Sequence, residues 1–280
     1  MTLELSLDEL LDILDGRLAV GMMSDRVGPV VTDTRGDIEN AWFLCLPGER
    51  FDGHDFVGEA FSSGALGCIV NERPSYPIAG TSFPLVAVAD TREALFKLAR
   101  NWRRRLNYKV VVLAASERDF SARVFASLQA DLPRAQDFFV HAIDTRIVQP
   151  RELMIAMLSA GPELDLLLVD LVASSVESAR SLIHALGPDL CCLSGQPFEY
   201  LRLQESTAAI SDLTDSLVKE LDSRRGFLLF CPGSEADELP VWVSRYPALE
   251  RECLVEIESS SAEKSLIEKT LARIKSWIES

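Results

Sequence analysis

Basic side chains are scarce in this sequence. Its 280 residues include 28 Lys and Arg against 43 Asp and Glu, which gives a formal net charge of −15. Nucleic acid and anionic lipid surfaces repel so acidic a chain, and we expect neither as a partner. Long hydrophobic runs are also missing, because no stretch approaches the roughly 18 apolar residues of a membrane span. The N-terminus, MTLELSLDEL, lacks the apolar core of a signal peptide, so we expect a cytoplasmic protein.

Patterns that usually mark metal sites, disulfides or nucleophiles are absent as well. The six cysteines form no C-x-x-C pair, and most lie inside apolar runs such as GCIV and LCCL. In that setting we expect small core residues in a reducing compartment. The three histidines lack metal-ligand spacing, and no G-x-S-x-G motif occurs. The sequence therefore predicts no metal site and no hydrolase-type nucleophile elbow.

The chain is long enough for about two domains, since one domain usually takes roughly 100 to 200 residues. With 48% hydrophobic residues it can fill both cores. A capping-box spacing of Ser6 and Glu9 predicts that a short helix opens the fold. In the second half, apolar strands alternate with amphipathic helices, which predicts a mostly parallel sheet with helices on both faces. We predict an α/β protein with a small N-terminal α/β domain (1–107), a P-loop-like central domain (108–258) and a C-terminal amphipathic helix (259–280).

The C-terminal helix carries an unusually large apolar stripe. Its hydrophobic side chains recur at helical spacing and would bury on the order of 500 Å² or more, too much to leave in water. We expect the helix to dock either on the central domain or on a second copy of the chain. The stripe consists of Ile267, Leu271, Ile274, Trp277 and Ile278.

The stretch 109–128, KVVVLAASERDFSARVFASL, is typical of a buried strand, a short loop and a helix. An α/β protein usually holds the phosphates of a nucleotide at such a junction, with glycines, a Lys and a Ser or Thr for Mg²⁺. Between Ala114 and Arg123 there is neither Gly nor Lys, and the carboxylates of Glu117 and Asp119 would repel a polyphosphate. We predict the architecture of a nucleotide-binding domain without its chemistry.

Two polar segments near the N-terminus form a second candidate site. The first, TDTR, follows an apolar stretch, and the second reads PGERFDGHD. In the structural alternative, the Asp and Arg of TDTR close a turn on each other, the two glycines are turn residues, and the histidine caps a helix. In the functional interpretation, both segments bind a ligand. The candidate ligand residues are Thr32, Asp33, Thr34, Arg35, Gly48, Arg50, Asp52, Gly53 and His54.

These segments carry a family resemblance. Residues 30–70, VVTDTRGDIENAWFLCLPGERFDGHDFVGEAFSSGALGCIV, closely resemble the first domain of the Mur ligases, and within that family the MurF branch of peptidoglycan synthesis. The order and spacing of TDTR and GERFDGHDF make the resemblance specific. In the family this domain holds the UDP end of the UDP-MurNAc-peptide substrate. The resemblance implies that the candidate residues form a UDP-sugar site, and it continues more faintly to about Phe230.

The resemblance also implies where the ATP chemistry of the family would lie. The family's phosphate loop falls on residues 114–123, with its catalytic Lys on Asp119 and its Mg²⁺-binding Thr on Phe120. Of the aligned metal positions only Asp170, where the family has Glu, keeps a side chain that binds metal. The degenerate loop comprises Ser116, Glu117, Arg118, Asp119 and Phe120. The His of the family falls on Tyr200, and its carbamylated Lys falls near Thr214.

These losses imply a catalytically inactive, MurF-like pseudoenzyme without cofactor or metal. The family's third domain is absent from the alignment, and the amphipathic tail stands in its place. We expect a binding, regulatory or scaffold protein of cytoplasmic peptidoglycan precursor synthesis. Its candidate partners are UDP-MurNAc-peptide, an active Mur ligase or other cell-wall synthesis protein, and a second copy through the C-terminal helix. Two alternatives stay open: a divergent ligase that is active only with a partner subunit, and a pure interaction module without ligand.

Overall fold

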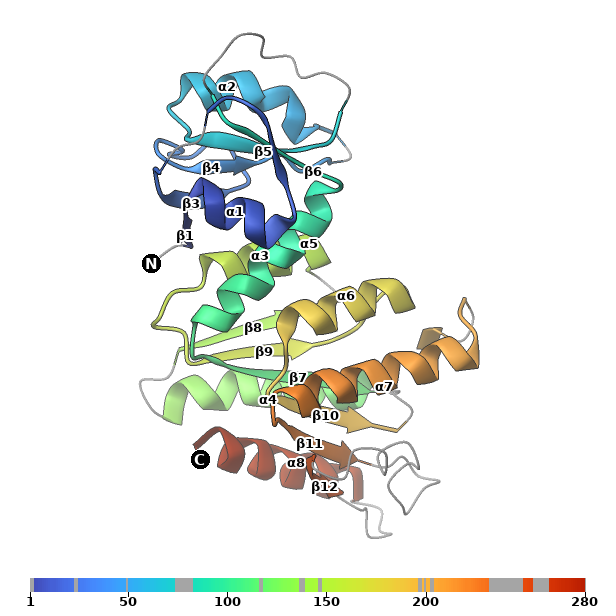
Figure 1. Cartoon of the computed structure of the whole chain (residues 1–280). Helices are drawn as coiled ribbons and strands as arrows, with labels where there is room; N and C mark the ends of the chain where they lie inside the picture. The colour runs from blue at the N-terminus through green and yellow to red at the C-terminus, as the bar shows by residue number, and fades with distance from the viewer. Residues whose placement is uncertain are drawn as a thin grey trace. The chain divides into compact units, whose positions relative to one another are not determined.

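The structure is a computed structural model in which the chain divides into two compact units (Figure 1). One unit comprises Met1–Leu106 with Met154–Gly161, and the other Asn107–Leu153 with Pro162–Ser280. The residues that the structure describes are 3–22, 25–48, 50–73, 83–115, 118–135, 139–145, 148–195, 198, 200–201, 204–231, 249–253 and 262–279. No helix in these ranges is long and apolar enough to cross a lipid bilayer.

The first unit is built on a mixed sheet with the strand order β1-β3-β4-β5-β6-β2 among its described residues. Its central strands are parallel neighbours: β3 (Gly28–Val31), β4 (Trp42–Leu44), β5 (Gly67–Asn71) and β6 (Leu85–Val88). The edge strands β1 (Glu4–Leu5) and β2 (Arg17–Val20) pair antiparallel with β3 and β6. The helices are α1 (Leu7–Leu14), η1 (Gly53–Phe56, a 3-10 helix), α2 (Val57–Ser62) and α3 (Thr91–Arg105). The capping box of Ser6 and Glu9 at the start of α1 is confirmed.

The second unit holds a sheet whose described strands are all parallel, in the order β12-β11-β10-β7-β9-β8. The strands are β7 (Lys109–Ala115), β8 (Val140–Asp144), β9 (Leu166–Asp170), β10 (Leu190–Ser194), β11 (Phe227–Cys231) and β12 (Glu250–Cys253). The helices are α4 (Arg118–Ala135), α6 (Val176–Leu186), α7 (Thr207–Ser223) and α8 (Ala262–Glu279), while α5 (Pro150–Ser159) is divided between the units. Helices α4 and α8 lie on one face and α6 and α7 on the other, so the predicted fold class is confirmed (Figure 1).

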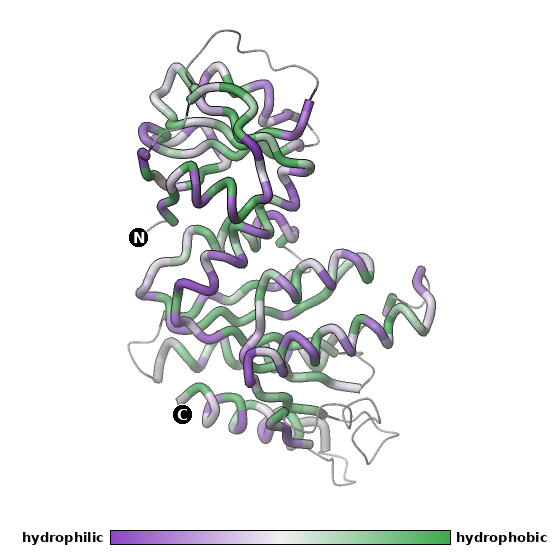
Figure 2. Tube along the Cα trace, viewed as in Figure 1, coloured by the Kyte–Doolittle hydropathy of each residue, from purple (hydrophilic) through white to green (hydrophobic). Residues whose placement is uncertain are grey.

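Both sheets are formed by apolar segments. The strands are mainly hydrophobic, whereas the helices alternate hydrophobic and hydrophilic residues along their length (Figure 2). Strands β9, β10 and β11 are buried at every position, as expected of parallel strands covered on both faces. The described free cysteines are all buried, which agrees with the expected core role: Cys45, Cys68, Cys191, Cys192 and Cys231.

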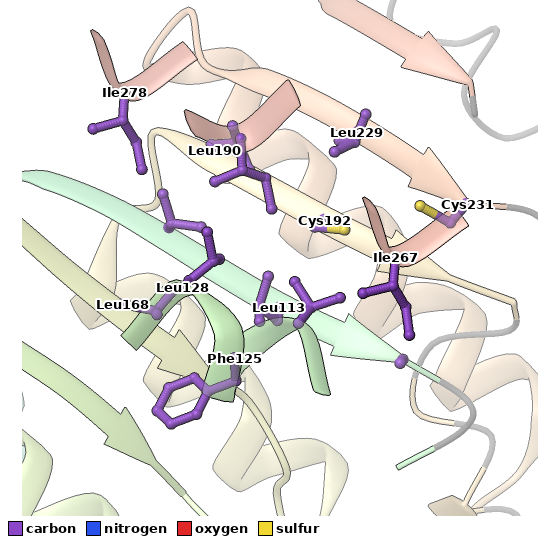
Figure 3. Packing of buried hydrophobic residues seen from close by; sticks show 14 of the residues in the cluster. Leu113, Phe125, Leu128, Leu168, Leu190, Cys192, Leu229, Cys231, Ile267 and Ile278 are labelled. Atoms are coloured by element: carbon purple, nitrogen blue, oxygen red, sulfur yellow. The ribbon is translucent and has the colours of Figure 1, made fainter. Parts of the chain in front are cut away.

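The C-terminal helix α8 is part of the core of the second unit. Ile267 and Ile278 of α8 lie in one buried cluster with Leu128 of α4 and Leu190 of β10 (Figure 3). Ile274 of the same helix is fully buried. The apolar stripe therefore docks within the chain, on the sheet and on α4. The expected docking on the central domain is confirmed, whereas self-association through α8 stays a prediction.

Polar contacts fasten the end of α8. The ammonium of Lys109 donates to the carbonyl oxygens of Trp277 and Ile278 at 3.3 and 2.8 Å. It also lies 4.9 Å from the centre of the Trp277 ring. A cation at this position satisfies carbonyls that the last helical turn leaves without a partner and meets the negative end of the helix dipole. The first residue of β7 thereby caps the helix.

Candidate functional site

The two polar segments singled out in the sequence lie at one edge of the first unit. Residues 32–35 follow β3, and residues 45–52 follow β4. The parallel strands β3 to β6 are in register, with Val31 opposite Phe43 and Asn71 opposite Val88. Their carboxyl ends therefore share one edge, and the start of α3 lies at this edge as well. In open α/β sheets, ligands bind outside the carboxyl ends of parallel strands.

The turn at residues 32–35 is closed by its own side chains. Oδ1 of Asp33 accepts the backbone N–H of Arg35 at 2.9 Å, and the guanidinium pairs with the same carboxylate at 2.6 Å. Hydrogen bonding to Asp33 and its negative charge raise the pKa of Arg35. The Arg35 side chain is 88% exposed. Thr32 and Thr34 are half-buried. An anionic ligand would have to compete with Asp33 for this arginine.

The loop after β4 folds back on itself as a tight turn. Pro47 and Asp52 form an isolated antiparallel bridge, and the N–H of Gly48 donates to the carbonyl of Phe51 at 3.0 Å. Gly53 lies directly behind the turn, where a Cβ atom would sit 2.6 Å from the backbone nitrogen of Leu46. Only glycine fits this close approach of two backbone segments. The turn therefore holds its exposed side chains in a defined place.

His54 lies inside the unit, with 6% of its surface exposed. Its Nδ1 is 2.5 Å from Oδ1 of Asp52, and its Nε2 accepts the backbone N–H of Asn71 at 2.9 Å. Because Nε2 accepts, the ring proton is on Nδ1 and is donated to Asp52. The Oδ1 atom of Asn71 in turn accepts the N–H of Thr91 at 2.7 Å. This chain of contacts links the loops after β4, β5 and β6.

The structural alternative, in which His54 caps the helix, is wrong. The residue that caps the helix η1 is Asp52, whose Oδ1 accepts the N–H of His54 at 3.0 Å. Both ring nitrogens of His54 are used within the unit. Its side chain therefore braces the loops after β4 and β5.

The Asp52 carboxylate is held in its charged form. Burial raises its pKa, but hydrogen bonds from the His54 backbone and ring, together with the charge of Arg73, outweigh that effect. The resulting pKa lies below the usual value for an aspartate. Arg73 is 3.4 Å from Oδ2 of Asp52, so the carboxylate meets a partner on each oxygen.

Sequence reasoning missed two arginines at this edge, Arg73 and Arg92. Arg73 follows β5, and Arg92 is in the first turn of α3, where its Nη2 donates to the carbonyl of Pro47 at 3.5 Å. Arg73 thus contacts Asp52 and Arg92 contacts Pro47, the two residues that form the bridge. One sequence signal could have found them. A parallel sheet brings the first residues after every strand to the same edge, so the segments after the third and fourth parallel strands were also candidates for the ligand site.

The second unit carries the positions that the resemblance assigns to ATP chemistry. Strand β7 ends at Ala115 and α4 begins at Arg118, so two residues connect them. Those residues, Ser116 and Glu117, lie outside the described part, as do the side chains of Arg118 and Asp119. Phe120 is buried and belongs to the hydrophobic cluster under the sheet.

The remaining positions of that alignment are buried or bonded within the unit. Asp170 ends β9 and is fully buried. The Tyr200 hydroxyl accepts the N–H of Ala173 at 2.9 Å. Thr214 is buried in α7, and its hydroxyl donates to the carbonyl of Ile210 at 3.1 Å. Within the described ranges, no group of three or more His, Cys, Asp or Glu side chains is arranged to hold a metal ion.

Comparison with known proteins relates this chain to the Mur ligases, and the resemblance seen in the sequence is confirmed. No protein-family model matches. The chain is 36% identical over 114 residues to the UDP-N-acetylmuramoyl-tripeptide--D-alanyl-D-alanine ligase of Haemophilus influenzae, a match that covers 41% of this chain and 24% of that protein. A ligase of the same name from Synechocystis is 33% identical over 119 residues, a match that covers 41% of this chain and 26% of that protein. The matched region thus spans about a quarter of each relative.

Solved MurF structures share the fold of this chain. MurF from Acinetobacter baumannii superimposes with a TM-score of 0.65 at 19% identity, covering 91% of this chain and 53% of that one. MurF from Thermotoga maritima, solved in complex with ADP, superimposes with a TM-score of 0.60 at 20% identity. The match covers 81% of this chain and 50% of that one. At this identity the structural likeness shows the fold alone. The chain spans about half the length of these structures.

Proposed function

We propose that this chain is a non-catalytic, MurF-like binding protein of cytoplasmic peptidoglycan precursor synthesis. In this proposal the first unit binds the UDP-sugar end of a UDP-MurNAc-peptide. The second unit keeps the shape of a nucleotide-binding domain without binding ATP. The protein then serves as a scaffold or regulator, for which an active Mur ligase is the natural partner.

The observation that carries the proposal is the short connection between β7 and α4. A phosphate-binding loop of the G-x-x-x-x-G-K-[ST] type wraps several backbone N–H groups around the β-phosphate. Here the strand and the helix are separated by two residues, Ser116 and Glu117. The remaining residues of the aligned loop are the end of β7 and the first turns of α4. So short a connection supports the loss of the phosphate cradle, independently of the missing Lys.

The surroundings of the aligned Mg²⁺ positions support the same conclusion. A ligase that forms an acyl phosphate needs a Lys and Mg²⁺ to neutralise the charge that develops on the transferred phosphoryl group. At the Mg²⁺-binding Thr position, the Phe120 ring is committed to the hydrophobic core. Near the carbamylated Lys position, Thr214 is bonded to its own helix. Phe120 has no oxygen to offer a metal, and the Thr214 hydroxyl is buried against its own helix.

The first unit, in contrast, keeps a polar and well-braced loop cluster at the edge where an α/β sheet binds ligands. The bridge between Pro47 and Asp52, the close approach at Gly53 and the bonds of the His54 ring fix one loop in place. Such preorganisation reduces the entropy lost on binding. A chain that keeps this order at one site while its other site is degenerate is well suited to binding without turnover.

Calorimetric titration tests the two halves of the proposal separately. We expect saturable binding of UDP-MurNAc-tripeptide and no binding of Mg-ATP at millimolar concentration. A saturable ATP isotherm, or ATP hydrolysis above a denatured control, would instead favour a divergent ligase. If that hydrolysis required an added subunit, the chain would be an enzyme completed by its partner. If UDP-MurNAc-tripeptide produces no heat of binding, the alternative of a pure interaction module without ligand is favoured.

A pair of glycine substitutions tests whether the loop after β4 belongs to the binding site. Gly53→Ala places a Cβ 2.6 Å from the Leu46 backbone and must displace the loop. Gly58→Ala, on the following helix, meets nothing within 4 Å and is the matched control. We expect the first variant to weaken UDP-MurNAc-tripeptide binding at least about tenfold, by loss of a charge-assisted contact, and the second to leave it unchanged. Equal affinities would exclude the loop.

A further inference from the structure

The edge of the first unit's sheet opposite the candidate site, where the parallel strands begin, carries three exposed hydrophobic side chains. Met22 follows β2, Val27 precedes β3, and Phe61 lies in the last turn of α2, shortly before β5. They are 68%, 52% and 49% exposed, and the described part has only two other large hydrophobic residues so exposed, Phe51 and Phe139. Single exposed hydrophobic residues are normal, whereas a contiguous group often marks a site of interaction. We call Met22, Val27 and Phe61 the amino-edge surface.

A buried ring joins two members of the amino-edge surface. Gly21, directly before Met22, packs on the backbone of Phe83, where a Cβ atom would sit 2.6 Å from the carbonyl oxygen. The Phe83 ring meets the Phe61 ring at an angle of 66°, with 5.0 Å between the centroids. Phe83 itself is buried. Phe61 therefore packs on a core residue on one side and exposes the rest of its ring next to the segment that carries Met22.

A second set of contacts joins Phe61 to Val27. The turn after α2 reaches the segment before β4, where the N–H of Asn40 donates to the carbonyl of Gly64 at 3.0 Å. The Asn40 side chain accepts a hydrogen bond from the guanidinium of Arg26, the residue directly before Val27. The three exposed side chains thus lie on connected segments and together present on the order of 300 Å² of apolar surface, a size that is often functional on a monomer.

The border of the amino-edge surface is acidic. The segments that form it carry one cation, Arg26, and three exposed carboxylates: Asp25, Glu39 and Glu59. Glu39 lies against the turn after α2, since a Cβ atom on Gly64 would be 3.3 Å from its side chain. Such a border repels nucleic acid and anionic lipid. Two copies that met through this same surface would bring their carboxylates together, which is also unfavourable. The charge therefore favours a basic protein partner.

We infer that the amino-edge surface binds a partner protein that presents hydrophobic side chains flanked by Lys and Arg. The inference rests on the scaffold role in the proposed function and deepens it, because it assigns the partner to the edge opposite the ligand. A ligand at the carboxyl edge and a partner at the amino edge can then bind at the same time. In such a contact a few buried side chains supply most of the binding energy, and opposite charges speed the encounter.

Fluorescence anisotropy with two synthetic helical peptides tests the chemistry of this surface on the full chain. One peptide has a leucine face and a lysine face, and the other carries glutamate in place of lysine. We expect the lysine peptide to bind at least about tenfold more tightly, and its affinity to fall as salt is added. Met22→Ser and Phe61→Ser should each weaken it at least about fivefold. Phe139→Ser, at an exposed phenylalanine of the second unit, is the matched control and should change nothing.

Three results would overturn the inference. Neither peptide binds at millimolar concentration, both peptides bind equally, or the two surface variants behave like Phe139→Ser. Met22→Ser keeps this test independent of folding, because that side chain is mostly exposed. Sedimentation provides a further check, since a dimer that Met22→Ser dissociates would assign the surface to a second copy and overturn the inference as well.

Titration with UDP-MurNAc-tripeptide separates the inference from the proposed function. Met22→Ser and Phe61→Ser should bind this ligand as the unaltered chain does, and a parallel loss in both variants would overturn the assignment of partner and ligand to opposite edges. If the unaltered chain binds the lysine peptide but not UDP-MurNAc-tripeptide, the amino-edge surface stands and the proposed ligand fails. If it binds UDP-MurNAc-tripeptide but not the lysine peptide, the proposed ligand stands and the inference fails.

Discussion

Replacing His54 by Leu should destabilise the first unit without removing a ligand contact. The ring bridges the Asp52 carboxylate and the backbone N–H of Asn71, and it is 6% exposed. Leucine is close in size, so the main change is the loss of both hydrogen bonds. Asn71 then keeps an N–H group without its partner, and Asp52 loses a donor that stabilises its charge.

The magnitude follows from these two losses. A hydrogen bond to a charged group contributes about 1.5 to 3 kcal/mol, and a buried donor left unsatisfied costs about 1 to 3 kcal/mol. Because the contact to Asn71 is only partly buried, the lower part of each range applies. We expect His54→Leu to lower the free energy of unfolding by roughly 2 to 4 kcal/mol, out of a total of about 5 to 15 kcal/mol for a domain.

Urea unfolding combined with hydrogen exchange measures this effect. Exchange of the Asn71 amide should accelerate in the variant, because that amide loses its acceptor. Arg35→Gln is the control, since its pair with Asp33 is exposed to solvent and should leave the free energy of unfolding nearly unchanged. If His54→Leu keeps both its unfolding free energy and its Asn71 protection but loses UDP-MurNAc-tripeptide binding, then His54 contacts the ligand and the brace is refuted.

Three further predictions concern stability. The folded-state pKa of Asp52 is lowered, so its carboxylate contributes stability above its unfolded pKa of about 3.9 that is lost as the pH falls through the folded value. Asp52→Asn should destabilise the chain at pH 7 by urea unfolding, and the gap to the unaltered protein should close below about pH 4. Ile274→Ala, at a fully buried position of α8, should cost about 2 to 5 kcal/mol in thermal unfolding, and a value under 1 would mean that the helix is not docked. Lys109→Met removes the cap on α8 and its cation–π contact with Trp277, so we expect a loss of about 1 to 2 kcal/mol; unchanged stability would show the cap to be incidental.

Features set by local sequence were predictable. The Ser6 and Glu9 spacing gave a helix start that the structure confirms. The alternation of apolar strands and amphipathic helices gave the parallel sheet of the second unit, and the apolar stripe of the last helix required a docking surface. The closure of the turn by Asp33 and Arg35 was also among the alternatives, because the two side chains are neighbours in the sequence.

Features set by strand register were not predictable from one sequence. The partner of the His54 ring, Asn71, is 17 residues away on another strand, so the bracing role of this histidine left no local signal. The contact from Arg92 to Pro47 joins residues 45 apart in the sequence. Only the pairing of β4, β5 and β6 brings these groups to one edge, and no local pattern encodes that pairing.

Helix α5 is divided between the two units, so the first unit is formed by two separate segments of the sequence. Residues 154–161 complete a body that otherwise ends at Leu106, and the indole N–H of Trp102 donates to the carbonyl of Ala160 at 2.9 Å. A fragment that stops at Leu106 leaves this indole without its acceptor and uncovers the surface that the later segment packs on. Recombination at a single point cannot transfer such a unit whole to another protein. Two exchange points, or the entire chain, have to move together, which ties the inheritance of the braced loop cluster to that of the second unit.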